Sequence, residues 1–224
     1  MSAGAPNRRT VLTALGLGLA TAGCGAVDSG RPVATSRRGG ESAPGCVLTP
    51  EGTEGPYYVD TDLIRGDIRE GRPGAPLSLR VTVVDADSCD PLRAAAVDIW
   101  HADARGAYSG VEEESRFLRG IQHTDNAGIV SFSTIVPGWY DNRTIHIHVK
   151  VHVGGQEVHT GQVYFDDEVT AAVAAVAPYA DRADPRTRND QDFLFRRGDD
   201  HALLSVAGHP STGYRADITI GVRA

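Results

Sequence analysis

Residues 144–153 read TIHIHVKVHV, and this stretch decides how the rest of the chain is interpreted. Apolar and polar side chains alternate at every position, which is the period of a β-strand with one buried face. The apolar face holds Ile145, Ile147, Val149 and Val151. We expect this face to pack on the core, so that His146 and His148 project together from the opposite face.

Short strand-like runs of the same kind fill most of the remaining chain. They cover residues 77–84, 95–102, 120–124, 128–135, 158–165 and 214–222, separated by turn signals such as DNAG at 125–128. One helix is expected over 168–177, capped by Asp166 or Asp167 and ended by Pro178. The pattern predicts a mostly β fold, with an antiparallel β-sandwich core, long loops and one or two short helices.

The first 24 residues have the order of an export signal. Arg8 and Arg9 precede an apolar run at 11–20 that is too short to span a bilayer, and small residues follow. The arginine pair resembles a twin-arginine signal. TAGC at 21–24 resembles a lipobox that would acylate Cys24, whereas ATA at 20–22 also fits an ordinary cleavage site. We therefore expect an exported protein that is either lipid-anchored or secreted.

The domain organisation follows from this leader. Residues 25–45 are Gly-, Ser-, Ala-, Pro- and Arg-rich and are expected to form a flexible linker, so the folded domain is expected to cover 46–224. In an oxidising compartment Cys46 and Cys89 are expected to form a disulfide, the alternative being two free buried thiols. The net charge of −7 argues against a nucleic-acid partner.

Three further motifs give the histidine pair a context, since two polar residues on a solvated strand face would also produce H-x-H. They are TPEGTEGPYY at 49–58, WHADARGAYS at 100–109 and PGWY at 137–140. With the 144–153 strand, these motifs resemble the intradiol ring-cleavage dioxygenases, the family of catechol 1,2-dioxygenase and protocatechuate 3,4-dioxygenase. The resemblance extends from about Cys46 to the end of the sequence, and it implies a non-haem iron(III) enzyme.

The resemblance carries over a ligand set residue by residue. Tyr108 matches the tyrosine of W-x-A-x-x-x-G-x-Y, Tyr140 matches that of P-G-x-Y, and the paired histidines are His146 and His148. Iron(III) is a hard ion that prefers anionic oxygen donors and can deprotonate a phenol. One iron(III), two tyrosinates and one hydroxide sum to zero charge, which suits a buried site.

Two more residues have implied catalytic roles. Arg143 matches the family's arginine three residues before the first histidine, and Gln162 matches its glutamine before an apolar-Tyr-Phe segment. Both would stabilise charge that develops on the substrate, and Tyr140 would leave the metal when the substrate binds. The alternatives are a surface pair between Arg143 and Asp141, and a sheet-edge role for Gln162.

The implied function is the opening of a catechol-type ring between its hydroxyl-bearing carbons by O₂, giving a muconate-type dicarboxylic acid. A homodimer is a possible assembly, and a lipid anchor at Cys24 is the expected route to a membrane. One alternative is an exported β-sandwich binding module without catalytic activity. Another is a zinc or copper enzyme that uses His146, His148 and a third histidine.

Overall fold

The computed structural model describes residues 47–111, 114–198 and 200–224. The predicted export signal, the linker, the acylation site Cys24 and the disulfide residue Cys46 all lie outside these ranges. None of the described helices has the length and apolar character needed to cross a membrane.

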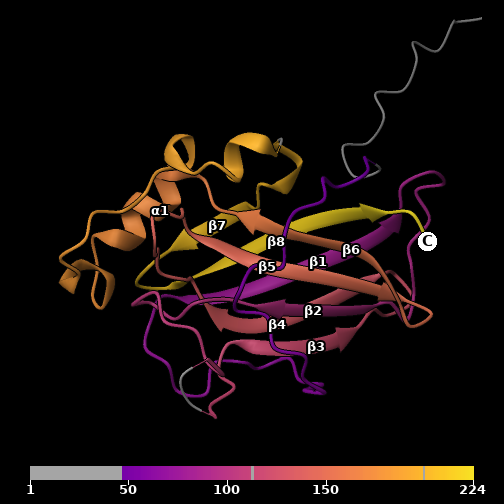
Figure 1. Ribbon diagram of the computed structural model, residues 1–224, viewed down its shortest axis with the longest axis horizontal. Helices are drawn as coiled ribbons and strands as arrows, with labels where there is room; N and C mark the ends of the chain where they lie inside the picture. The colour runs from indigo at the N-terminus through magenta and orange to yellow at the C-terminus, as the bar shows by residue number, and fades with distance from the viewer. Residues whose placement is uncertain (1–46, 112–113, 199) are drawn as a thin grey trace, which may run out of the picture. The chain divides into compact units, whose positions relative to one another are not determined.

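Within the described ranges, eight strands form two four-stranded sheets (Figure 1). The first, here called the β1 sheet, contains β4 (Ile129–Ile135), β1 (Pro76–Asp85), β8 (Gly213–Val222) and β7 (Ser205–His209) in that order. The second, here called the β5 sheet, contains β3 (Arg119–His123), β2 (Ala96–Trp100), β5 (His146–Val153) and β6 (Gln156–Tyr164) in that order. The predicted mostly β architecture is confirmed.

Two details of the strands differ from the prediction. β1 and β8 pair in parallel, with Leu77 opposite Tyr214 and Asp85 opposite Val222, so the sandwich is not purely antiparallel. β7 was not predicted, because its sequence SVAGH has no apolar alternation and its side chains are mostly exposed. Such a strand is held by backbone pairing with β8 rather than by a buried face.

The core lies between the two sheets and confirms the face assignment of the 144–153 stretch. Ile147, Val149 and Val151 of β5 are buried in the same apolar cluster as Leu79 and Val81 of β1. A register shift of one residue would put the histidines into this cluster and Ile147, Val149 and Val151 outside it. Burial of each such side chain contributes about 1.5–3 kcal/mol, so the correct register is strongly favoured.

The predicted helix forms but ends early. α1 spans Asp167–Ala174, and the Asp166 side chain accepts a hydrogen bond from the Glu168 backbone N–H at 2.8 Å, as expected of a helix cap. Four short 3₁₀ turns follow: Tyr179–Asp181, Asn189–Gln191, Phe195–Arg197 and Asp200–Ala202.

The outer face of the β5 sheet is covered by residues 50–58, here called the 50–58 strap. Contacts run from β6 through β5 to β3: Gly52 N–H donates to Thr160 O at 2.8 Å, Lys150 Nζ to Glu54 Oε2 at 2.7 Å, and Arg119 Nη2 to Tyr57 O at 2.7 Å. On β2, the Trp100 ring packs against the Tyr58 ring at 4.7 Å. The face that carries the two histidines is therefore enclosed rather than solvated.

We propose that Cys89 pairs with Cys46, as the sequence predicts. Thr49 N–H donates to Gly221 O at 2.9 Å and Ala86 N–H to Val222 O at 2.8 Å, so the segments beside both cysteines meet at the end of β8. Replacing either cysteine with serine is expected to lower the free energy of unfolding by about 2–4 kcal/mol. Denaturant titration of both single variants and the double variant would measure it. Additive losses in the double variant would contradict a shared bond.

Candidate metal centre

Tyr108 is placed by the tight loop that follows β2. One oxygen of Asp103 accepts hydrogen bonds from the backbone N–H groups of Arg105 and Ala107 at 2.8 and 3.0 Å. Gly106 has φ +88°, and a Cβ there would lie 2.6 Å from the Trp139 carbonyl oxygen. The glycine of this motif is therefore required both by backbone conformation and by the close approach of the PGWY loop.

Tyr140 precedes a turn with two residues at positive φ, Asp141 at 44° and Asn142 at 60°. Aspartate and asparagine tolerate this region better than most residues. The turn closes with Arg143 N–H donating to Tyr140 O at 2.6 Å. It brings Arg143 and the Tyr140 ring to the start of β5, beside the histidines.

His146 and His148 lie on the outer face of β5, and their side chains are almost fully enclosed, at 2% and 1% exposure. The two Nε2 atoms are 3.2 Å apart, so the predicted pair does converge. His146 Nδ1 lies 2.6 Å from the Thr144 carbonyl oxygen. A carbonyl can only accept, so Nδ1 carries the hydrogen and Nε2 presents a lone pair.

The two tyrosines complete a cluster of four donor atoms. The Tyr108 and Tyr140 hydroxyls are 3.0 Å apart, and the Tyr140 hydroxyl is 3.0 Å from His146 Nε2. Neighbouring ligands of one ion with bonds of about 2.1 Å stand about 3 Å apart at right angles. The observed separations therefore fit a single metal ion. Among the described residues there is no group of three or more His, Cys, Asp or Glu that could hold a metal ion, so no third histidine joins His146 and His148 there, as the zinc or copper alternative would need.

Arg143 and Gln162 lie next to this cluster. Arg143 Nε donates to Asp192 Oδ2 at 2.8 Å, and its Nη2 donates to Gln162 Oε1. The predicted alternative partner Asp141 is not the ion-pair partner of Arg143. Gln162 stands opposite His148 in the β5–β6 pairing and is 7% exposed, although β6 is an edge strand. Sequence reasoning did not connect Asp192 with Arg143.

A family model described as a dioxygenase matches residues 53–185, more than half of the chain and a span that contains all four donors. A solved structure titled an intradiol ring-cleavage dioxygenase from Tetranychus urticae is 32% identical, covering 79% of this chain and 94% of that one, with a TM-score of 0.76. The chain belongs to the intradiol ring-cleavage dioxygenase family.

Other members of the family align over different extents. The dioxygenase domain of a dioxygenase carbohydrate-binding protein fusion from Streptomyces sp. SirexAA-E is 32% identical, over 78% of this chain and 99% of that one, with a TM-score of 0.61. A catechol 1,2-dioxygenase of Acinetobacter baylyi is 32% identical over 142 residues, which are 51% of this chain and 45% of that protein. The chain spans about half the length of the curated relatives it matches.

Burial controls protonation at the site of this intradiol-family chain. Burial, reinforced by the charge of Arg143, lowers the pKa of His146 to about 3, and burial lowers the pKa of His148 well below its usual value. Both imidazoles are therefore neutral donors. Burial raises the pKa of Tyr108 and of Tyr140, which keeps both phenols protonated until a cation replaces the protons.

Aromatic rings surround the donors. The Tyr57 ring stacks on Tyr108 at 4.4 Å and 12°, and the Trp100 ring stacks on His148 at 4.9 Å and 12°. Tyr57 and Tyr108 also line a small hollow of about 190 Å³ together with Gly106, Ala107 and Val111. These contacts fix the ring planes of two donors, and they place Tyr57 of the strap directly beside Tyr108.

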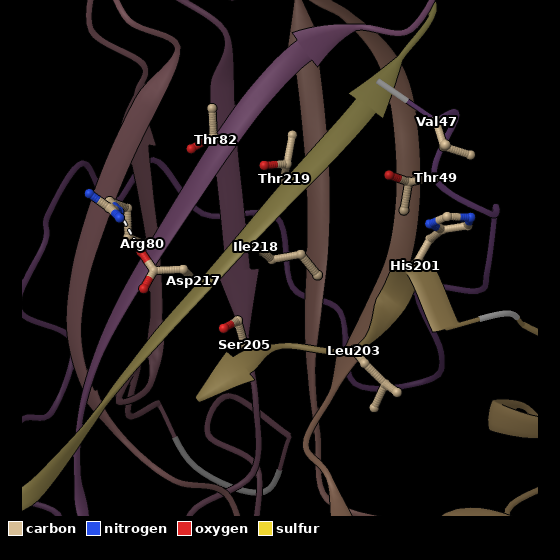
Figure 2. A pocket seen from close by; sticks show the side chains of 10 residues that line it. All are labelled: Val47, Thr49, Arg80, Thr82, His201, Leu203, Ser205, Asp217, Ile218 and Thr219. Carbon is tan, nitrogen blue, oxygen red and sulfur yellow. Dashed lines mark hydrogen bonds and ion pairs between the residues drawn. The ribbon is translucent and has the colours of Figure 1, made fainter. Parts of the chain in front are cut away.

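A larger hollow of about 450 Å³ lies elsewhere, on the outer face of the β1 sheet (Figure 2). Figure 2 shows Arg80 of β1 and Asp217 of β8 facing each other as an ion pair on this surface. None of the four donor residues lines it. The size of a hollow therefore does not identify the chemical site in this chain.

Asp98, on β2, provides a test of burial that is separate from the donors. Burial raises the pKa of this carboxyl from 3.8 to about 7, despite opposing effects of Tyr58 and Lys150. Between those pH values the folded state holds more protons than the unfolded state, so stability falls as pH rises from 4 to 7. This increase in the pKa of Asp98 corresponds to a loss of unfolding free energy on the order of 4 kcal/mol across that range, since one pKa unit corresponds to about 1.4 kcal/mol.

Replacing Asp98 with asparagine should therefore flatten this pH dependence. We expect the free energy of unfolding of Asp98→Asn to change less between pH 4 and pH 8 than that of the unaltered chain. Urea titrations across this range would measure it, and groups common to both proteins cancel in the difference. Identical slopes for the two proteins would show that Asp98 does not titrate as inferred.

Proposed function

We propose that the chain is an exported, non-haem iron(III) intradiol dioxygenase that inserts both atoms of O₂ into a catechol-type ring and opens it to a muconate-type dicarboxylic acid. The observation that carries the proposal is the convergence of two phenol oxygens and two imidazole nitrogens at 3.0–3.2 Å. The relatives named catechol 1,2-dioxygenase support the same ring-opening chemistry. The binding-module alternative does not account for the enclosed donor cluster.

Tyr108, Tyr140, His146 and His148 would hold the ion. When bound, iron(III) supplies the Lewis acidity that makes the coordinated catechol ring reactive toward O₂. The Tyr140 phenolate oxygen accepts one of the substrate's hydroxyl protons. Tyr140 suits this role because it stands on the 140–143 turn, whereas Tyr108 is held by its stack with Tyr57.

Arg143 and Gln162 stabilise negative charge that develops on the substrate. The Arg143 side chain is 11% exposed, and its guanidinium is fixed by the buried carboxylate of Asp192 and by the Gln162 side chain. A pre-positioned cation in an enclosed site offsets negative charge on the substrate with little reorganisation. The 50–58 strap contacts the same glutamine, because Gln162 Nε2 also donates to Thr53 O at 3.2 Å.

A visible absorption spectrum of the purified, iron-reconstituted chain tests this function. Tyrosinates bound to iron(III) should give an intense red-brown charge-transfer band that shifts to longer wavelength when catechol is added under nitrogen. Admitting O₂ should then yield the dicarboxylic acid, detected by mass spectrometry. A chain that stays colourless after iron reconstitution would remove the proposal and favour the binding module.

We further propose that Arg8 and Arg9 direct export and that Cys24 is the acylation site, both on the strength of the sequence order alone. Fractionation of expressing cells, with mass spectrometry of the mature N-terminus, separates the outcomes. A lipid-modified Cys24 supports anchoring, cleavage after Ala22 supports secretion, and full-length protein in the cytoplasm contradicts export.

A further inference from the structure

The segment Asn189–Phe195, here called the 189–195 clamp, packs against the start of β5. It lies outside residues 53–185, which the family model matches, so the family match does not account for it. It contains the 3₁₀ turn Asn189–Gln191, the first residue of the turn Phe195–Arg197, and the buried residues Asn189 and Asp192. Its side chains form hydrogen bonds with Arg143 and Thr144, which precede the two histidines.

Asp192 is the centre of the clamp. Its side chain is 0% exposed. Oδ1 accepts hydrogen bonds from the backbone N–H groups of Leu194 and Phe195 at 2.8 and 3.2 Å, which fixes the orientation of the carboxylate. Oδ2 accepts from Arg143 Nε and from Thr144 N–H, both at 2.8 Å. One oxygen therefore anchors the carboxylate to its own segment, and the other holds the Arg143–Thr144 pair.

Asn189 makes a second connection to the same place. The Thr144 hydroxyl donates to Asn189 Oδ1 at 2.7 Å, and Asn189 Nδ2 donates to Phe165 O at 2.9 Å. The Thr144 carbonyl in turn accepts the hydrogen of His146 Nδ1. The clamp is thus linked to the His146 imidazole through Thr144, and it forms a direct hydrogen bond with the Arg143 guanidinium.

The charge of Asp192 is maintained in this enclosed position. Burial alone would raise the pKa of its carboxyl, but the charge of Arg143 and the backbone donors outweigh burial and lower the pKa. Removing an ionised partner from such a pair leaves the other charge buried and unpaired, which lets it turn toward other acceptors. Without Asp192, Arg143 would keep Gln162 as an acceptor.

We propose that Asp192 is a positioning residue that aims the Arg143 guanidinium at the metal centre. The inference rests on the proposed function. A displacement of about 1 Å in a group that stabilises the reaction can cost about 100-fold in rate. We therefore expect Asp192→Asn to lower kcat by about 10–100-fold while KM changes little, because substrate anchoring stays with the metal ligands.

The experiment is a double-mutant cycle with Arg143→Met on the iron-reconstituted full chain. If Asp192 acts through Arg143, Asp192→Asn should lower kcat by less than about threefold in the Arg143→Met background, since coupled residues are not additive. Anaerobic catechol titration of the visible band, read independently of turnover, should give dissociation constants within about threefold for all four proteins. Equal kcat losses in both backgrounds would overturn the inference.

Asp167→Asn is the matched control. Asp167 pairs with Arg186 at 2.6 Å and accepts from Asn189 N–H at 3.3 Å, so it holds the same clamp without contacting Arg143. Asp167→Asn should lower the free energy of unfolding without lowering kcat. A kcat loss equal to that of Asp192→Asn would mean that loosening the clamp is enough to slow turnover, which would overturn the inference. If Asp192→Asn does not fold, Asp192→Glu takes its place, and an unchanged kcat there would also overturn it.

The unaltered chain separates the two proposals. If it binds no iron and shows no colour, the proposed function fails and this inference fails with it. If it is coloured and active but Asp192→Asn turns over at the same rate, the inference alone fails.

Discussion

Replacing His148 with alanine is expected to abolish iron binding and ring-cleaving activity. His148 Nε2 is one of four donors and lies 3.2 Å from His146 Nε2, so its loss opens the coordination shell on one side. Losing a contact that merely supports a ligand costs about 10–100-fold in metal affinity or activity, and losing the ligand itself should cost more. Iron content per chain and the visible band after reconstitution would measure the effect.

His152→Ala is the control for this prediction. His152 lies two residues further along the same face of β5 from Lys150 and lines a different hollow, beside Asp98 and Tyr58. Because His152 lines a hollow that none of the four donors lines, we expect this variant to retain iron, colour and turnover. A His148→Ala protein with full iron content and activity would exclude His148 as a ligand.

Replacing Arg119 with methionine is expected to lower the free energy of unfolding by about 3 kcal/mol. Each lost hydrogen bond from a charged donor costs about 1.5–3 kcal/mol. Removing the buried charge offsets part of this loss, because the charge no longer has to be desolvated. Arg119 is 2% exposed. It donates to Tyr57 O, Ser109 O and Ser109 Oγ at 2.6–2.9 Å. It therefore ties the 50–58 strap to the loop that carries Tyr108. Denaturant titration measures the loss.

The same variant should also weaken turnover, since the stacked Tyr57 and Tyr108 rings lose their common support. Arg80→Met provides the comparison. Arg80 is also on a strand and forms an ion pair with Asp217, but both side chains are about half exposed. Such a pair contributes at most about 1 kcal/mol. Equal stability losses for the two variants would contradict the role given to Arg119.

The common face of His146 and His148 could be predicted from sequence because the alternation in the 144–153 stretch is a local rule. Tyr108 and Tyr140 are placed in the ligand set only by the family resemblance of their motifs. The separations of 3.0–3.2 Å required the structure, since four residues from three segments converge only through tertiary packing.

Contacts between distant segments could not be predicted. Arg143 and Asp192 are 49 residues apart, and a carboxylate after a turn-like NDQ gives no signal of its partner. Alternation assigns Lys150 to the face opposite the core, but it says nothing of the strap that buries it there to 4% exposure. Arg119 begins a strand and has the sequence features of a surface residue. In each case the covering segment, rather than the strand, determines the environment.

The parallel pairing of β1 with β8 has a consequence for the order of folding. Arg80 and Asp217, which face each other across this pair, are 137 residues apart, whereas every strand of the β5 sheet comes from residues between Ala96 and Tyr164. Closing a loop of that length costs about 4 kcal/mol of chain entropy before any contact repays it. Pairings of such high sequence separation slow folding. We therefore expect the half of the sandwich that bears the candidate metal ligands to assemble first, and the insertion of β8 between β1 and β7 to be a late, slow step.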